Sequence, residues 1–169
     1  MDEYFDKYEI IVSDKFDEKS VLVCEKIAWE NNHFNKDRIG KGKLRYIGLV
    51  SSYADFLVRL VCDGKTMGFL ALTENYKKQN DLYIMLGAVR PEMQNIGVMT
   101  KLLTYLVRHS AGFDYLTADS RKDDKKWWQM LEKFGFRHTE VEKDEDENYH
   151  YVLDVKNVTE NLSLKDNQG

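Results

Sequence analysis

The sequence predicts a mixed α/β (α+β) protein, and three observations lead to that fold class. Short apolar runs typical of strands alternate with apolar stripes at spacings of three and four, which are typical of helices. The chain has 169 residues and is 43% hydrophobic, which suits one packed core. No repeat or linker interrupts the pattern, so we expect one domain over residues 1–155 and a polar tail over residues 156–169.

The first expected elements are a strand at residues 8–12 and a helix after it. Asp17 offers this helix an N-cap, because its side-chain oxygen is able to accept a bond from an open amide of the first turn. The apolar stripe of this helix consists of Val21, Cys24 and Ala28, and the helix is expected to end at about Asn31. The polar, basic stretch at residues 31–48 predicts a loop or a broken helix.

Three strands follow, and turn signals separate them. Asp63 and Gly64 form a strong hairpin dipeptide, and residues 75–80 form a second polar turn. The third strand is a nearly continuous apolar run, and Pro91 ends it because proline has no amide for the ladder. The expected strands are residues 55–61, 66–73 and 82–89.

The second half of the pattern alternates helices and strands. An apolar stripe predicts a helix from about Ile96 to His109. Asp123 or Asp124 caps a further helix, which Gly135 ends as a left-handed C-cap. The expected strands in this half are residues 115–118, 136–141 and 149–155.

Composition narrows the class of protein. The formal net charge of -4 disfavours tight non-specific binding to a nucleic-acid backbone. No apolar run approaches the ~18 residues of a membrane span, and the acidic N-terminus does not resemble a signal peptide. We therefore expect a cytoplasmic protein without a membrane partner. Cys24 and Cys62 are expected to be reduced thiols, and the histidine and cysteine spacings predict no metal site.

The segment from Leu86 to Leu103 carries the clearest chemical signal. A buried strand stops before Pro91, and a short loop leads directly into a helix. The opening amides of a helix lack intrahelical partners and lie at the positive end of its dipole, so they favour an anion such as a diphosphate. Gly97 has no Cβ and lets a ligand approach the backbone closely. An ordinary strand-loop-helix unit is the alternative for this segment alone.

Two motifs resemble the GNAT superfamily of N-acetyltransferases. Val89, Pro91, Gln94 and Gly97 match its Val-x-Pro, spacer, Arg/Gln-x-x-Gly motif, which binds acetyl-CoA. The sequence Trp-Gln-Met-Leu-Glu-Lys-Phe-Gly-Phe at residues 128–136 is similar to the family's Leu-Tyr-Glu-Lys-Leu-Gly-Phe. The element order over residues 8–155 matches as well. The resemblance implies a mixed, mostly antiparallel central sheet flanked by helices and splayed open after the strand ending at Val89.

The resemblance also implies the residues that hold acetyl-CoA, which would serve as cosubstrate. The amide of Val89 would bond the pantetheine or thioester region, and the amides of residues 94–100 would hold the diphosphate. The implied cofactor-binding residues are Ala88, Val89, Gln94, Asn95, Ile96, Gly97, Val98, Met99, Thr100 and Asp124.

Two residues depart from the family pattern. Met99 stands where the family has a small residue, and its side chain would either crowd the phosphates or point into the core. Leu131 stands where members often carry a tyrosine that protonates the departing thiolate. A thiol with a pKa of about 8.5 is able to leave unprotonated, so the loss is compatible with catalysis, with a different reaction or with none.

Candidate catalytic residues come from the strand before Val89 and its neighbour. The resemblance places a glutamate base six residues before Val89, and Tyr83 stands there in this sequence. A tyrosine is a poor base near pH 7 but is able to hold a water or the acceptor. Asp81 and Asp119 are nearby carboxylates that would act through a water, with a solvated strand end as the alternative. The acidic residues 144–147 would attract a cationic acceptor or serve only as a solvated turn.

Three functions follow as hypotheses. The first is an acetyl-CoA-dependent N-acetyltransferase that acetylates a primary amine, on a small molecule or a protein, by direct attack. The second is a catalytically inactive GNAT-like module that binds CoA or a protein. The third is a GNAT-fold enzyme that modifies a nucleic-acid base, for which the basic residues 36–45 beside Tyr46 are the only support. We expect a monomer or a homodimer.

Overall fold

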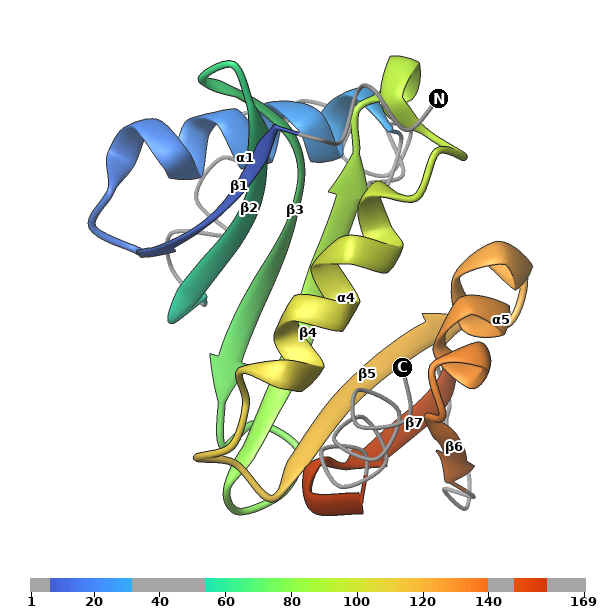
Figure 1. Ribbon diagram of the computed structural model, residues 1–169. Coiled ribbons are helices and arrows are strands. Elements are labelled where there is room, and N and C mark those ends of the chain that lie inside the picture. Colours follow the sequence, from blue (N-terminus) through green and yellow to red (C-terminus); the bar gives the residue numbers. More distant parts are fainter. Residues whose placement is uncertain (1–6, 32–53, 140–147, 158–169) are drawn as a thin grey trace, which may run out of the picture. The chain divides into compact units, whose positions relative to one another are not determined.

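A computed structural model describes residues 7–31, 54–139 and 148–157 (Figure 1). The strands form one hydrogen-bonded sheet in the order β1-β2-β3-β4-β5-β7-β6. This mixed sheet with its helices confirms the predicted fold class. No helix in the described part of the chain is long and apolar enough to cross a membrane. The strands are β1 (Tyr8–Asp14), β2 (Phe56–Cys62), β3 (Lys65–Glu74), β4 (Asp81–Val89), β5 (Tyr115–Arg121), β6 (Arg137–Thr139) and β7 (Asn148–Asp154).

The chain divides into two compact units. The first consists of Met1–Thr73 and Met85–Tyr105, and the second of Glu74–Ile84 and Leu106–Gly169. The division of the sequence into one domain and a tail stays a prediction, and most of that tail lies outside the described residues. The main helices within the described residues are α1 (Glu18–Glu30), η2 (Pro91–Met93), α4 (Val98–Arg108) and α5 (Lys125–Lys133).

In the first unit, α1 begins where the sequence predicts. The carboxylate of Asp17 accepts bonds from the backbone amide of Ser20, at 3.2 Å, and from its hydroxyl, at 2.8 Å. These bonds satisfy a first-turn amide that lacks an intrahelical acceptor. The predicted apolar stripe is buried in the core of this unit. That core consists of Val21, Cys24, Ile27, Ala28, Ala54, Leu57, Phe69, Ala71 and Ala88.

In the first unit, α1 and α4 cover opposite faces of the strands (Figure 1). Phe69 and Ala88 belong to the core under α1. Their neighbours Gly68 and Gly87 face α4, because a Cβ built on Gly68 would lie 2.9 Å from Val98 Cγ1. Successive residues of a strand point to opposite faces, so one sheet receives a helix on each side. A larger residue at Gly68 would collide with Val98 of α4 and crowd the carbonyl of Ala88, which lies 3.1 Å from the same point.

The hairpin between β2 and β3 follows the sequence signal. Asp63 has φ 50° and Gly64 has φ 75°, the left-handed pair that a tight two-residue turn requires. β1 and β3 both pair with β2 in antiparallel register, with Val58 opposite Val12 on one side and Leu70 on the other.

In the second unit, β5 lies between a parallel and an antiparallel neighbour. Residues Asp81 to Ile84 of β4 pair in parallel with Tyr115 to Ala118 of β5. β7 pairs antiparallel with the whole of β5, so that Asp119 lies opposite His150. This register brings together side chains that lie far apart in the sequence.

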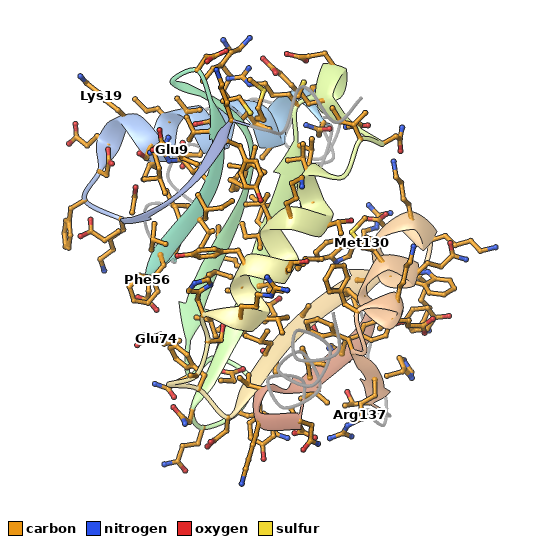
Figure 2. All side chains as sticks on the ribbon, viewed as in Figure 1. Glu9, Lys19, Phe56, Glu74, Met130 and Arg137 are labelled. Atoms are coloured by element: carbon orange, nitrogen blue, oxygen red, sulfur yellow. The ribbon has the colours of Figure 1, made fainter. Side chains whose placement is uncertain are left out.

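The helix α5 has the two predicted caps. Asp124 is its N-cap, and the carboxylate accepts from the amide of Trp127 at 3.4 Å. Gly135 ends it with φ 100°, and the amide of Phe136 donates to the carbonyl of Leu131 at 3.0 Å. Met130 marks this helix in Figure 2.

Candidate functional site

The start of α4 differs from the predicted boundary. Asn95 has φ 65° and Gly97 has φ 94°, both in the left-handed region that a right-handed helix excludes. The helix therefore begins at Val98 rather than at Ile96, and the single-turn helix η2 fills part of the predicted loop. The corner between η2 and α4, residues 94–100, is called the anion cradle below.

The anion cradle presents backbone amides that the helix does not use. The amide of Lys101 donates to the carbonyl of Gly97 at 3.0 Å, and this is the first ladder bond of α4. The amides of Val98, Met99 and Thr100 precede it and have no carbonyl one turn earlier within the helix. A Cβ built on Gly97 would meet no atom within 4 Å apart from its chain neighbours, so the space directly beside Gly97 is open in the described structure. Open amides at a helix N-terminus and free space beside Gly97 are features that favour an anion.

The end of β4 is oriented by its bond to β3. The amide of Arg90 donates to the carbonyl of Met67 at 2.8 Å. Because successive amides of an extended strand point in opposite directions, the N–H of Val89 is directed away from β3. The carbonyl of Val89 accepts from Asn31 Nδ2 at 2.7 Å and from Gln94 Nε2 at 3.3 Å. Gln94 also donates to Asn31 Oδ1, so two amide side chains meet at this strand end.

The side chain of Met99 points toward the sheet. Its Cε lies 3.2 Å from the position that a Cβ on Gly87 would take, and Leu70 Cδ2 lies 2.8 Å from the same point. The sequence is compatible with two orientations of the Met99 side chain, and the structure has the one in which this side chain packs on β4. The departure from the family motif at Met99 therefore directs its side chain toward Gly87 of the sheet.

The remaining predicted cofactor residues divide between the two units. Ala88 and Val98 are buried, Ile96 is half-buried, and Asn95 and Thr100 are exposed in the first unit. Asp124 belongs to the second unit, where it caps α5. Its place in the cofactor-binding set stays a prediction.

Two predicted catalytic residues meet in the second unit. Tyr83 Oη donates to Asp119 Oδ2 at 2.9 Å. His150 Nδ1 lies 2.6 Å from Asp119 Oδ1, and Lys77 Nζ lies 2.8 Å from Oδ2. These four residues are called the Asp119 centre below. The carboxylate is four-fifths buried and has a partner on each oxygen, so its orientation is fixed.

Tyr83 serves this centre as a neutral donor. Burial raises the pKa of its phenol well above the ordinary value, and the negative charge of Asp119 and the bond to it raise the pKa further. Its ring stacks on Tyr76 with 4.5 Å between centroids and 19° between planes. Because the phenol keeps its proton, Tyr83 orients the carboxylate instead of competing with it for protons.

Asp81 has a different role from Asp119. It is completely buried, and Oδ1 accepts from the amide of Tyr76 at 2.8 Å. Oδ2 accepts from the amide of Lys77 at 3.1 Å and from the hydroxyl of Thr117 at 2.6 Å. The described partners are two amides of the turn and one hydroxyl of β5, so these contacts favour a role for Asp81 in holding the turn before β4, and its catalytic role stays a prediction.

Sequence reasoning missed His150. Its ring lies beside Asp119 only because β7 pairs with β5, two strands that are not consecutive in the chain. The one usable signal was the alternation along both strands, which places each residue on a definite face once the register is known. Local motifs carry no information about that register.

Three further expectations concern Leu131, the charged segments and metal binding. Leu131 is completely buried, so the family's tyrosine position carries an apolar core residue. The basic residues 36–45, Tyr46 and the acidic residues 144–147 lie outside the described residues. Within the described ranges, no group of three histidine, cysteine or acidic side chains is arranged to hold a metal ion.

Comparison with solved structures places the chain among acetyltransferase folds. A protein from Desulfovibrio desulfuricans, described as a GNAT-family acetyltransferase, is 16% identical with a TM-score of 0.68 over 87% of this chain and 99% of its own. An N-acetyltransferase from Staphylococcus aureus Mu50 is 16% identical with a TM-score of 0.63 over 88% and 99%. PaiA N-acetyltransferase from Thermoplasma acidophilum, solved in complex with coenzyme A, is 13% identical with a TM-score of 0.64 over 88% and 99%.

At these identities the structural likeness shows the fold alone. No curated protein sequence matches the chain. The sequence profile of the Acetyltransferase (GNAT) family matches residues 21–136, more than half of the 169 residues, and includes both the anion cradle and α5. The chain therefore belongs to the GNAT family of acetyltransferases.

Proposed function

We propose that the protein is an acetyl-CoA-dependent N-acetyltransferase that acetylates a primary amine by direct attack. The observation that carries this proposal is the anion cradle, whose amides precede the first ladder bond of α4 and whose Gly97 faces open space. Family membership supports the acetyl-transfer chemistry, and the coenzyme A complex of the Thermoplasma acidophilum neighbour supports the choice of donor.

The described residues fit the diphosphate of coenzyme A. We assign the diphosphate to the amides at residues 97–100, because helix N-termini stabilise anions through open N–H groups and the dipole. We assign the pantetheine arm to the N–H of Val89, which is directed away from β3. The bound thioester would supply the activated acetyl group. The chain's own residues would bind the cofactor, orient the acceptor amine and remove its proton.

The Asp119 centre supports the proton transfer that an amine acceptor requires. An alkylamine with a pKa of about 10.4 is neutral in only about one molecule in a thousand near pH 7, a deficit of roughly 4–5 kcal/mol. His150 Nδ1 lies 2.6 Å from the carboxylate of Asp119, and the tautomer that donates an Nδ1–H hydrogen bond to this carboxylate carries its lone pair on Nε2. We propose His150 as the general base and Asp119 as the residue that sets its tautomer.

The departing thiolate has no tyrosine acid at the family's position. Leu131 is completely buried and offers no proton. A thiol with a pKa of about 8.5 leaves as a thiolate without prior protonation, so the proposed reaction does not require this acid.

The test separates binding from transfer. Acetyl-CoA is titrated calorimetrically into the wild type, Gly97→Ala and Gly64→Ala. Both glycines have positive φ, and neither has an atom within 4 Å of a built Cβ, so both substitutions strain the backbone by about 1–2 kcal/mol. We expect about tenfold weaker binding for Gly97→Ala alone, because only that position lies at the proposed diphosphate site.

A second assay follows release of the coenzyme A thiol with a panel of primary amines. Transfer by the wild type supports the enzyme, whereas binding without transfer to any amine points to the inactive module. Failure of the wild type to bind acetyl-CoA would overturn the proposed function altogether.

A further inference from the structure

A lysine ammonium of the protein itself lies against a carboxylate and two aromatic rings. Lys77 Nζ lies 2.8 Å from Asp119 Oδ2 and 5.5 Å from the ring centroids of both Tyr76 and Tyr83. A carboxylate together with aromatic faces within about 6 Å is the environment that a desolvated alkylammonium prefers. All four residues belong to the second unit.

The carboxylate of Asp119 does not depend on Lys77 for its orientation. Tyr83 Oη donates to the same oxygen at 2.9 Å, and His150 Nδ1 lies 2.6 Å from the other oxygen. The two tyrosine rings support each other by stacking. These contacts would therefore hold the carboxylate and the rings in place when the ammonium group leaves.

Lys77 is the replaceable member of the group. Its backbone is fixed, because its amide donates to Asp81 at 3.1 Å. Its side chain is one-third exposed and extends from a surface turn through four flexible methylenes. The ammonium group is thus able to withdraw into water while the turn stays in place.

We propose that Asp119, Tyr76 and Tyr83 form the binding site for the primary ammonium group of the acceptor, which Lys77 fills as an internal competitor. This inference rests on the proposed function for the identity of the ligand as the acceptor. The recognised class is an unhindered alkylammonium ion, such as the end of a diamine or a lysine side chain, because the present occupant has that chemistry. An acceptor that displaces Lys77 lies next to His150, the proposed base.

The inference predicts that removal of the competitor exposes the site. Cadaverine is titrated calorimetrically into the wild type, Lys77→Met and Lys77→Arg in the absence of acetyl-CoA. Methionine keeps an unbranched side chain but removes the charge, and arginine keeps the cation. We expect Lys77→Met to bind cadaverine about tenfold more tightly than the wild type, and Lys77→Arg to remain within about threefold of it.

Two further variants show where the diamine binds. In the Lys77→Met background, Asp119→Asn should abolish cadaverine binding and Tyr76→Ala should weaken it severalfold. Tyr76 is 60% exposed, so its truncation tests the proposed ammonium site even if Asp119→Asn fails to fold. Equal cadaverine affinity in the wild type and Lys77→Met, or no effect of Tyr76→Ala, would overturn the inference.

The design keeps the two proposals apart. Cadaverine binding is measured without acetyl-CoA, so a failed donor titration refutes the proposed function and leaves this result standing. Conversely, if the protein transfers acetyl groups but the wild type and Lys77→Met bind cadaverine with equal affinity, only the ammonium site is refuted.

Discussion

The anion cradle and the Asp119 centre are built from different parts of the chain. The cradle is main chain, made by consecutive residues that follow β4. The Asp119 centre is side chain, assembled from a turn and from β4, β5 and β7. A backbone site tolerates substitution of most of its side chains, whereas a side-chain site loses its chemistry with a single residue.

The largest expected effect is the loss of the proposed base. His150→Ala should lower kcat/KM for amine acetylation by about 10²–10⁴-fold, the usual contribution of general acid–base catalysis. His138→Ala is the matched control, because His138 contacts the rings of Tyr149 and Tyr151 but is exposed on β6. Kinetics with a saturating donor would measure both variants.

Chemical rescue separates catalysis from structure at this position. Added imidazole should restore part of the activity of His150→Ala if the ring acts as a base. Equal activity of His150→Ala and the wild type would remove His150 from the mechanism and leave the Asp119 centre as a structural cluster.

The contrast between the anion cradle and the Asp119 centre also explains how much of the fold and of the site the sequence predicted. The fold class, the strand before Pro91 and the caps at Asp17 and Asp124 follow from signals within a few residues of each other. The cradle was predicted for the same reason. The start of α4 was placed two residues early, because apolar periodicity continues through Ile96 while Gly97 is left-handed.

The Asp119 centre was predicted only in part. Tyr83 and Asp119 were candidates, but their partner His150 depends on the β5–β7 register and Lys77 on the folding of the turn around Asp81. Pairing between strands that are not consecutive, and the reach of a long side chain, are tertiary properties. No local pattern in the sequence encodes them.

The second prediction concerns stability. Asp81→Ala should lower the free energy of unfolding by about 2–4 kcal/mol, because it leaves the Thr117 hydroxyl and two turn amides without their acceptor. Asp123→Ala is the control, since its carboxylate is exposed and pairs with Arg121 at the surface, and it should change stability by less than about 0.5 kcal/mol. Urea unfolding compares the two. Equal stability would show that Asp81 does not hold the turn and would leave it among the catalytic candidates.

A smaller effect is expected at the strand end next to the cradle. Asn31→Ala removes bonds to the carbonyls of Ile27, at 2.8 Å, and Val89, at 2.7 Å, and should lower stability by about 1–2 kcal/mol. Asn31→Asp should be at least as destabilising, because an ionised carboxylate has no proton to donate to either carbonyl. A thermal melt in which Asn31→Asp matches the wild type would contradict this account of the bonds.

The smallest effect should come from the residue that departs most from the family motif. Met99→Ala should leave the dissociation constant for acetyl-CoA within about twofold of the wild type, since the thioether packs near Gly87 and the cradle acts through main-chain amides. Thr100→Ala, which truncates an exposed side chain in the same turn, should be equally silent. If Met99→Ala instead binds acetyl-CoA more than about fivefold tighter, the methionine obstructs the ligand. The cradle would then be a partly closed site that side chains govern, and the contrast with the Asp119 centre would no longer hold.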